Sequence, residues 1–138
     1  LRGVYVMNNC LTYALKIEDR ENLRPDNLDW SLTPLEAIRK VADKYNLQVR
    51  SVTECEGVTD KEWKICFFGF VPIHWDYEHK ADYFDYHLLL QNKDGKWMHR
   101  RSWHASPEEA NMQELIAEYL KYGYAPSYFA VSKQEVGI

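Results

Sequence analysis

A chain of 138 residues is long enough to bury one hydrophobic core, and 46% hydrophobic with 28% charged residues is ordinary for a globular protein. The 17 basic and 21 acidic residues give a formal net charge of −4, whereas nucleic-acid-binding proteins normally carry a basic excess. The one basic cluster is His99-Arg100-Arg101, and no apolar run approaches membrane-spanning length. We therefore expect a single domain, residues 1–138, with neither a nucleic-acid nor a membrane partner.

The first predicted helix lies close to the start of the chain. A short extended segment at residues 4–7 precedes a stretch from about Cys10 to Glu18 whose apolar residues follow helical spacing. Residues 22–32 contain Pro, Asn and Asp side chains typical of a loop.

A second helix has clear start signals. Thr33 is the expected N-cap, Pro34 occupies the first helical position, and Glu36 completes a capping box. The expected buried stripe of this helix is Leu35, Ile38, Val41, Ala42 and Tyr45. Residues 47–53 then alternate in the manner of a strand.

The middle of the sequence predicts a buried strand and a hairpin. The segment "KICFFGFVPI" (64–73) is almost continuously apolar, which favours a central strand covered on both faces. Residues 74–86 are polar and aromatic, and we interpret them as a loop. The segment 87–103 then contains two short strands around an "NKDG" turn.

The last third predicts one helix and one strand. Ser106 is the expected N-cap of the third helix, Pro107 and Glu109 repeat the capping-box pattern, and Gly123 ends it. Residues 127–132 form a closing strand. Helices that come first and a mostly antiparallel sheet that follows define the α+β class.

The three cysteines, Cys10, Cys55 and Cys66, are an odd number and cannot all pair within one chain. Their spacing indicates neither a disulfide framework nor a zinc site. At most, Cys55 and Cys66 form a bridge, and Cys10 is then the remaining thiol.

Cys10 stands at the predicted start of the first helix, directly after Asn8 and Asn9. A thiol attacks only as the thiolate, and unpaired N–H groups in the first turn of a helix lower the thiol pKa. Free cysteines are often core residues. The apolar face of this helix is already supplied, however, by Leu11, Tyr13 and Leu15. We therefore favour a nucleophile at Cys10.

Two histidines are brought together if the "NKDG" turn has the geometry that its glycine favours. A type I turn followed by glycine in the left-handed region gives a three-residue loop, 93–95, and pairs Asn92 with Lys96. Counted back from that pair, His87 and His99 are diagonal neighbours on one face, about 7–8 Å apart at the backbone. A two-residue loop would place them on opposite faces.

These residues suggest a catalytic triad. Cys10 is the expected nucleophile, His87 its general base, and His99 the residue that orients the His87 imidazole. The Cys10 backbone N–H, together with Asn9, would receive the oxyanion. The expected reaction is attack on an amide carbonyl, an acyl-thioester and hydrolysis, with no cofactor.

The same residues resemble a known family. "NNCLTYAL" and "DYHLLLQNKDGKWMHRRSW" are similar to the NlpC-type branch of papain-like cysteine peptidases and amidases, and closer to papain-like domains of bacterial toxins and secreted proteins. The resemblance covers about a quarter of the chain and leaves residues 20–65 unaligned. The hairpin ends in "HRRSW" rather than a His-Lys-Pro-Gly turn, which leaves the substrate open.

The resemblance implies a papain-like domain acting on a peptide or a peptidoglycan peptide, in a secreted or delivered bacterial protein. The chain opens on Leu1 rather than Met, so we expect it to be a piece of a longer protein. Substrate identity and oligomeric state stay open.

Three alternatives remain. His74, His79, His99, His104 and the cysteines supply enough ligands for zinc, although no pair has the usual spacing. The aromatic segment 75–86, with Trp75 and Tyr86, would serve as a peptide- or sugar-binding surface, or as one wall of an active-site groove. The same triad also suits acyl transfer, transglutamination or deamidation.

Overall fold

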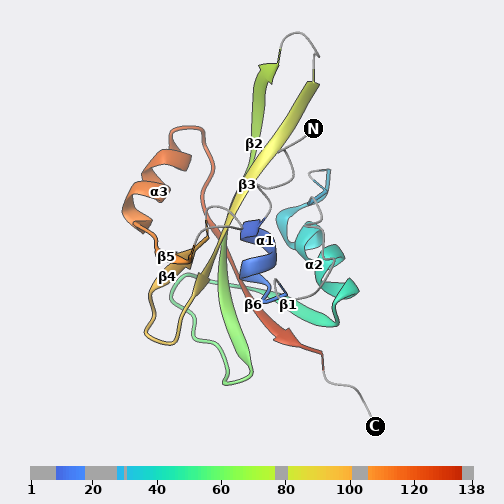
Figure 1. Ribbon diagram of the computed structural model, residues 1–138, viewed down its shortest axis with the longest axis vertical. Helices are drawn as coiled ribbons and strands as arrows, with labels where there is room; N and C mark the ends of the chain where they lie inside the picture. The colour runs from blue at the N-terminus through green and yellow to red at the C-terminus, as the bar shows by residue number, and fades with distance from the viewer. Residues whose placement is uncertain (1–8, 18–27, 30, 77–80, 101–105, 135–138) are drawn as a thin grey trace.

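The computed structural model describes residues 9–17, 28, 29, 31–76, 81–100 and 106–134. Within these residues, three helices and six strands make a mixed α+β fold (Figure 1). The helices are α1 (Asn9–Ala14), α2 (Pro34–Lys44) and α3 (Met112–Leu120). The strands are β1 (Leu47–Val52), β2 (Glu62–Asp76), β3 (Ala81–Gln91), β4 (Trp97–His99), β5 (Glu108–Glu109) and β6 (Ser127–Lys133).

The six described strands form one sheet in the order β1-β6-β2-β3-β4-β5, and every recorded pair is antiparallel. The last strand in sequence, β6, is inserted between β1 and β2. Figure 1 shows α1 and α2 on one side of the sheet and α3 on the other. No described helix has the length and apolar character needed to cross a membrane.

The sheet separates two hydrophobic clusters. The first cluster lies between the sheet and α1 and α2, and from the sheet it contains Leu47, Val49, Ile65, Phe67, Tyr86, Leu88, Leu90, Phe129 and Val131. The second cluster lies on the α3 side and contains Cys66, Phe68, Leu89, Ala110 and Tyr128. Neighbouring residues of β2 and β3 enter different clusters because strand side chains alternate between the two faces. The prediction that the apolar segment 64–73 is a central strand covered on both faces is confirmed over Ile65–Phe68, all fully buried.

The predicted start of α2 is confirmed. The Thr33 hydroxyl accepts a hydrogen bond from the Glu36 backbone N–H, and the Glu36 carboxylate accepts one from the Thr33 N–H. This reciprocal arrangement satisfies two donors that a helix start otherwise leaves unpaired. Four residues of α2 are buried, Ala37, Ile38, Val41 and Ala42, and they pack α2 against β1.

Helix α1 is shorter than predicted. It ends at Ala14, because Lys16 adopts a left-handed conformation (φ 58°) and the backbone N–H groups of Lys16 and Ile17 donate to Tyr13 and Thr12. These two bonds make a Schellman motif, which normally employs glycine at the left-handed position. Ile17, which ends the Schellman motif, is also buried. The apolar pattern therefore continues past Ala14 because residues of the helix end pack into the core, although they are no longer helical.

Two other predictions are wrong. Residues 74–76 and 81–86, expected to be part of a loop, continue β2 and β3 as a hairpin that Figure 1 shows extending beyond the helices. The third helix does not begin after Ser106. Glu108–Glu109 pair with β4 instead, and Asn111 is the N-cap that accepts a hydrogen bond from the Glu114 N–H. The predicted stop is confirmed, since Gly123 follows the helix with φ 84°.

An ion pair connects two strands that are not neighbours. Arg50 on β1 binds the Glu62 carboxylate on β2 through two hydrogen bonds, of 2.7 and 2.9 Å, and also contacts Glu56 at 3.0 Å. Because β6 lies between β1 and β2, this pair spans the intervening strand. The hydrogen bonds from Arg50 lower the pKa of Glu62 from its ordinary value of 4.5 to about 2.

The Glu62 pKa predicts an acid-sensitive contribution to stability. Since the folded-state pKa is depressed, the contribution is present above the ordinary value of 4.5 and is lost progressively as the pH falls from there through about 2. After allowance for solvent screening, Glu62→Gln is expected to lower the free energy of unfolding by about 1 kcal/mol at pH 7. Urea unfolding at pH 7 and pH 2.5 measures it: the difference between wild type and variant should be smaller at the lower pH, where the Glu62 carboxylate is partly protonated. An equal loss at both values would assign the effect to packing.

Candidate active site

The turn between β3 and β4 has the predicted three-residue geometry. Asn92 donates its N–H to the Lys96 carbonyl at 2.8 Å, and the Gly95 N–H donates to the Asn92 carbonyl at 3.0 Å. Gly95 has φ 82°, in the left-handed region that favours glycine. The Asn92 side chain adds two bonds that the sequence did not indicate, accepting the N–H groups of Asp94 and Lys96 at 2.9 Å each. The turn therefore fixes the register of the hairpin.

This register brings the two predicted histidines together. Leu90 pairs with Met98 and Gln91 with Trp97, as the predicted loop requires. His87 Nε2 and His99 Nδ1 lie 2.8 Å apart in a hydrogen bond, with ring centroids 5.1 Å apart and planes at 69°. The prediction that the two rings share one face of the hairpin is confirmed.

The two imidazoles join the strands at the end of the β3–β4 ladder. Among the described residues, backbone pairing of β3 with β4 is recorded no further than Leu90–Met98. His99 is only 5% exposed, and His87 is partly buried. Burial disfavours the charged form of an imidazole unless a partner stabilises it. A hydrogen bond between the rings supplies such a partner, and it leaves His87 Nδ1 and His99 Nε2 for other contacts.

Glu108 is part of this site and was not predicted. It is the register partner of His99 in the β4–β5 pair, and its Oε1 lies 3.7 Å from His99 Nε2. The sequence offered no signal for this contact, because the capping-box pattern around Ser106 placed Glu108 in a helix. Only the long-range pairing of β5 with β4 brings its carboxylate to His99.

Cys10 is the second residue of α1, and α1 packs directly against β3 and β4, the strands that carry His87 and His99. The thiol is 3% exposed and belongs to the first cluster. The expectation that Cys10 lies outside the apolar packing is therefore wrong. The physical reason is that α1 is enclosed on more than one side: Thr12, on another face of the helix, is also 3% exposed.

Successive residues of β3 pack into different hydrophobic clusters. Leu88 and Leu90 belong to the cluster that contains Cys10, whereas Leu89 belongs to the cluster on the α3 side. His87 alternates with Leu88 and is the register partner of Phe68, a member of the second cluster. Because β3 stays paired with β2 at Phe68–His87, strand alternation places His87 on the face that carries Leu89, not on the face that carries Leu88 and Leu90.

The predicted substrate-binding residues have different outcomes. Asn9 begins α1 and Trp75 lies in β2, but their side chains are outside the described part of the structure. Tyr86 is 7% exposed and stacks on Phe67 with ring centroids 6.2 Å apart. Tyr86 is therefore a core residue rather than part of an exposed aromatic surface.

The other two cysteines differ sharply from each other. Cys55 is exposed, whereas Cys66 is fully buried in the second cluster. Burial raises the pKa of the Cys66 thiol to about 12, and its side-chain hydrogen bond with Tyr128 offsets only part of that rise. No disulfide joins Cys55 and Cys66. Cys66 therefore behaves as a core side chain at neutral pH.

Metal ligation has no support in the described residues, where no three His, Cys, Asp or Glu side chains are grouped to hold an ion. His79 and His104 lie outside the described residues, as does the side chain of His74.

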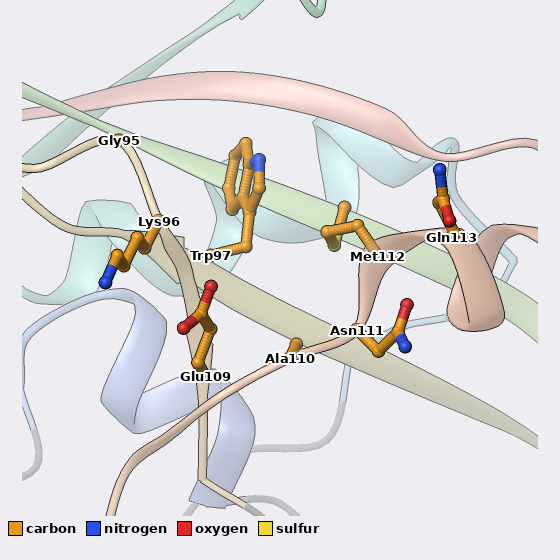
Figure 2. Close-up of a pocket in the computed structure, with 8 residues that line it drawn as sticks. All are labelled: Gly95, Lys96, Trp97, Glu109, Ala110, Asn111, Met112 and Gln113. Atoms are coloured by element: carbon orange, nitrogen blue, oxygen red, sulfur yellow. The ribbon is translucent and has the colours of Figure 1, made fainter.

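A pocket of about 560 Å³ lies between the β3–β4 turn and the start of α3. Figure 2 shows the Trp97 indole and the Met112 side chain pointing into the same space above the sheet. The pocket lies apart from the histidine pair, since its lining residues are Gly95, Lys96, Trp97, Glu109, Ala110, Asn111, Met112 and Gln113.

No protein-family model, curated protein sequence or solved structure shows significant similarity to this chain. Functional inference therefore depends on the geometry of its own residues.

Proposed function

We propose that the protein is a papain-like thiol hydrolase that cleaves an amide bond through an acyl-enzyme on Cys10, with His87 as base and His99 as the residue that orients it. One observation carries the proposal. The 2.8 Å hydrogen bond between His87 and His99 joins the two strands against which α1, the helix of Cys10, is packed. A base held by a second polar side chain and adjacent to a nucleophile is the general layout of such sites.

The atoms of the imidazole pair suit these roles. His87 uses Nε2 for its bond to His99, so Nδ1 is the nitrogen that would accept the Cys10 proton. The resulting thiolate attacks the amide carbonyl, and the oxyanion is received by the Cys10 N–H with Asn9 as a second donor. The imidazolium then protonates the leaving amine. Water, deprotonated by His87, hydrolyses the thioester and regenerates the thiol.

The ion pair with His87 has to supply most of the stabilisation of the thiolate. Burial to 3% exposure favours the neutral thiol. Helix α1 has only six residues, so few aligned peptide dipoles act on Cys10. An imidazolium beside the sulfur offsets both effects, since nearby cations are what lower thiol pKa values in proteins.

The architecture is compatible with the resemblance of the two motifs to the papain-like group. An N-terminal helix carrying the cysteine precedes an antiparallel sheet whose neighbouring strands carry the two histidines. A peptide or peptidoglycan peptide as substrate follows from that resemblance. Transfer of the acyl group to an amine uses the same triad and differs only in the acceptor. A binding module built on residues 75–86 is less well supported, because Tyr86 is buried.

Selective alkylation tests the proposal, because the three thiols have three different environments. The experiment uses the Cys55→Ser variant, treats the folded protein with iodoacetamide at pH 6.5, and maps the modified residue by mass spectrometry. Cys10 should be modified, since it would be a thiolate at this pH. Cys66, with a pKa of about 12, is the internal control and should stay unmodified. Protection of both thiols until urea unfolds the protein would identify Cys10 as a core residue and overturn the proposal.

A further inference from the structure

His99 has a second polar neighbour that the triad does not use. Its Nδ1 contacts His87, and its Nε2 lies 3.7 Å from Glu108 Oε1. The His99 side chain is 7% exposed, while that of Glu108 is 54% exposed. A carboxylate at the edge of the sheet thus faces the buried end of an imidazole pair.

The protons of this pair have two possible arrangements when both rings are neutral. In the first, His87 Nε2–H donates to His99 Nδ1, and the other proton is on His99 Nε2. In the second, His99 Nδ1–H donates to His87 Nε2, and His87 carries its proton on Nδ1. Only in the first arrangement is His87 Nδ1 unprotonated and thus able to accept a proton from a thiol.

We propose that Glu108 is a positioning residue that selects the first arrangement. Its carboxylate favours a proton on His99 Nε2, so His99 Nδ1 must accept the hydrogen bond and His87 must donate it. The consequence for catalysis rests on the proposed function. The consequence for the protons of His99 and His87 holds whether or not Cys10 is a nucleophile.

Glu108 is the described carboxylate placed for this role. On the elements packed against β4, the other titratable groups whose side chains are described are Tyr86 and His87 on β3, Glu109 on β5, and Cys10 and Tyr13 on α1. The side chains of Asp82, Tyr83 and Asp85, also on β3, lie outside the described part of the structure. Glu109 is the register partner of Met98, so alternation directs its side chain away from His99. Glu109 is therefore a matched control with the same charge, strand and exposure class as Glu108.

Nitrogen-15 NMR of the imidazole rings reads the proton positions directly. In the Cys10→Ala background at pH 8, where no thiol gives its proton to His87, both rings should show the proton on Nε2, and the Glu108 and Glu109 variants are compared in this same background. Glu108→Gln should produce a mixture of arrangements at His99 and His87, whereas Glu109→Gln should leave the spectra unchanged. Glu108→Asp keeps a carboxylate and should restore at least part of the preference. Because Glu108 is largely exposed, these variants should fold.

Alkylation of Cys10 gives the second readout, in the Cys55→Ser background. Glu108→Gln should slow the reaction at pH 6.5 by about two- to fivefold, as expected for a partly exposed charge pair, and move the acidic limb of the pH profile upward. Glu109→Gln should change neither. If Glu108 had a purely structural role, Glu108→Gln would lower the stability of the protein without shifting the pH profile of Cys10 alkylation or the proton positions on the two rings.

The outcomes separate the two proposals. Spectra of Glu108→Gln identical to those of its Cys10→Ala parent would overturn the role of Glu108, whatever the reactivity of Cys10. A change in the spectra with an unreactive Cys10 in every variant would support Glu108 as the determinant of the proton arrangement and overturn the thiol hydrolase.

Discussion

Replacing His87 by alanine should lower the rate at which iodoacetamide modifies Cys10 at pH 6.5 by about 100-fold. Without the imidazole, the proposed site has no cation beside the thiol, and a cysteine with the ordinary pKa of about 8.5 is thiolate in only about one part in 100 at this pH. The measurement is the second-order rate constant, determined by mass spectrometry in the Cys55→Ser background.

The His99→Ala variant is the graded comparison. In the proposed mechanism His99 only orients His87, so its removal should cost roughly 10- to 100-fold less than removal of the base, as for the orienting member of other triads. His87→Asn retains a side-chain N–H for His99 and separates loss of the base from loss of the hydrogen bond. Equal alkylation rates in wild type and His87→Ala would show that His87 does not act on Cys10.

The largest expected effect on stability is at Phe67. This side chain is fully buried, stacks on Tyr86, and belongs to a strand paired on both sides, with β3 and with β6. Phe67→Ala removes a ring from the first cluster and leaves a cavity, which costs about 3–5 kcal/mol. Domains of this size are often stable by only about 5–15 kcal/mol, so the variant should be close to unfolding at 37 °C.

Denaturation in urea, followed by circular dichroism, gives the measurement. The control is Tyr122→Ala, which removes an aromatic ring that is 63% exposed and should change stability by less than about 0.5 kcal/mol. Phe67→Leu retains most of the buried volume, so its loss of stability should lie between those of Phe67→Ala and Tyr122→Ala. A loss at Phe67 no larger than that at Tyr122 would contradict the assignment of Phe67 to the core.

The sequence predicted best where the determining interactions are local. The capping box at Thr33 and Glu36 involves residues three apart, and the loop at 93–95 is decided by one glycine. The register of the hairpin, and with it the contact between His87 and His99, follows from that glycine. The contact between His87 and His99 could therefore be predicted from the sequence alone, without knowledge of the tertiary structure.

The predictions that failed involve partners far away in the sequence. Ser106 and Glu109 have the pattern of a helix start, but Glu108 and Glu109 gain backbone pairing with Met98 and His99, and the helix begins after Asn111. In the same way, the aromatic segment 74–86 is polar enough for a loop, yet its residues 83–86 pair with residues 69–73 of β2, and Ala81 pairs with Asp76. Local patterns compete with such pairing and carry no information about it.

The burial of Cys10 could not be foreseen for a related reason. The residues that the sequence assigned to the apolar face of α1 would suffice for a helix lying on the surface of a sheet. In the structure, α1 is covered on further sides, so that Thr12 and Cys10 are buried as well. How many sides of a helix are covered depends on the placement of the whole helix, which periodicity alone does not define.

The position of β6 has a consequence for how the chain acquires its structure. In the described sheet, β1 and β2 are not paired with each other, and both pair with β6, whose residues lie 60 to 86 positions further along the chain. A nascent chain emerging from the ribosome therefore cannot complete this sheet until residues 127–133 have been synthesised. Until then, the facing edges of β1 and β2 are open to association with other chains, which makes rapid closure by the final strand, or protection by a chaperone, important for the yield of folded protein.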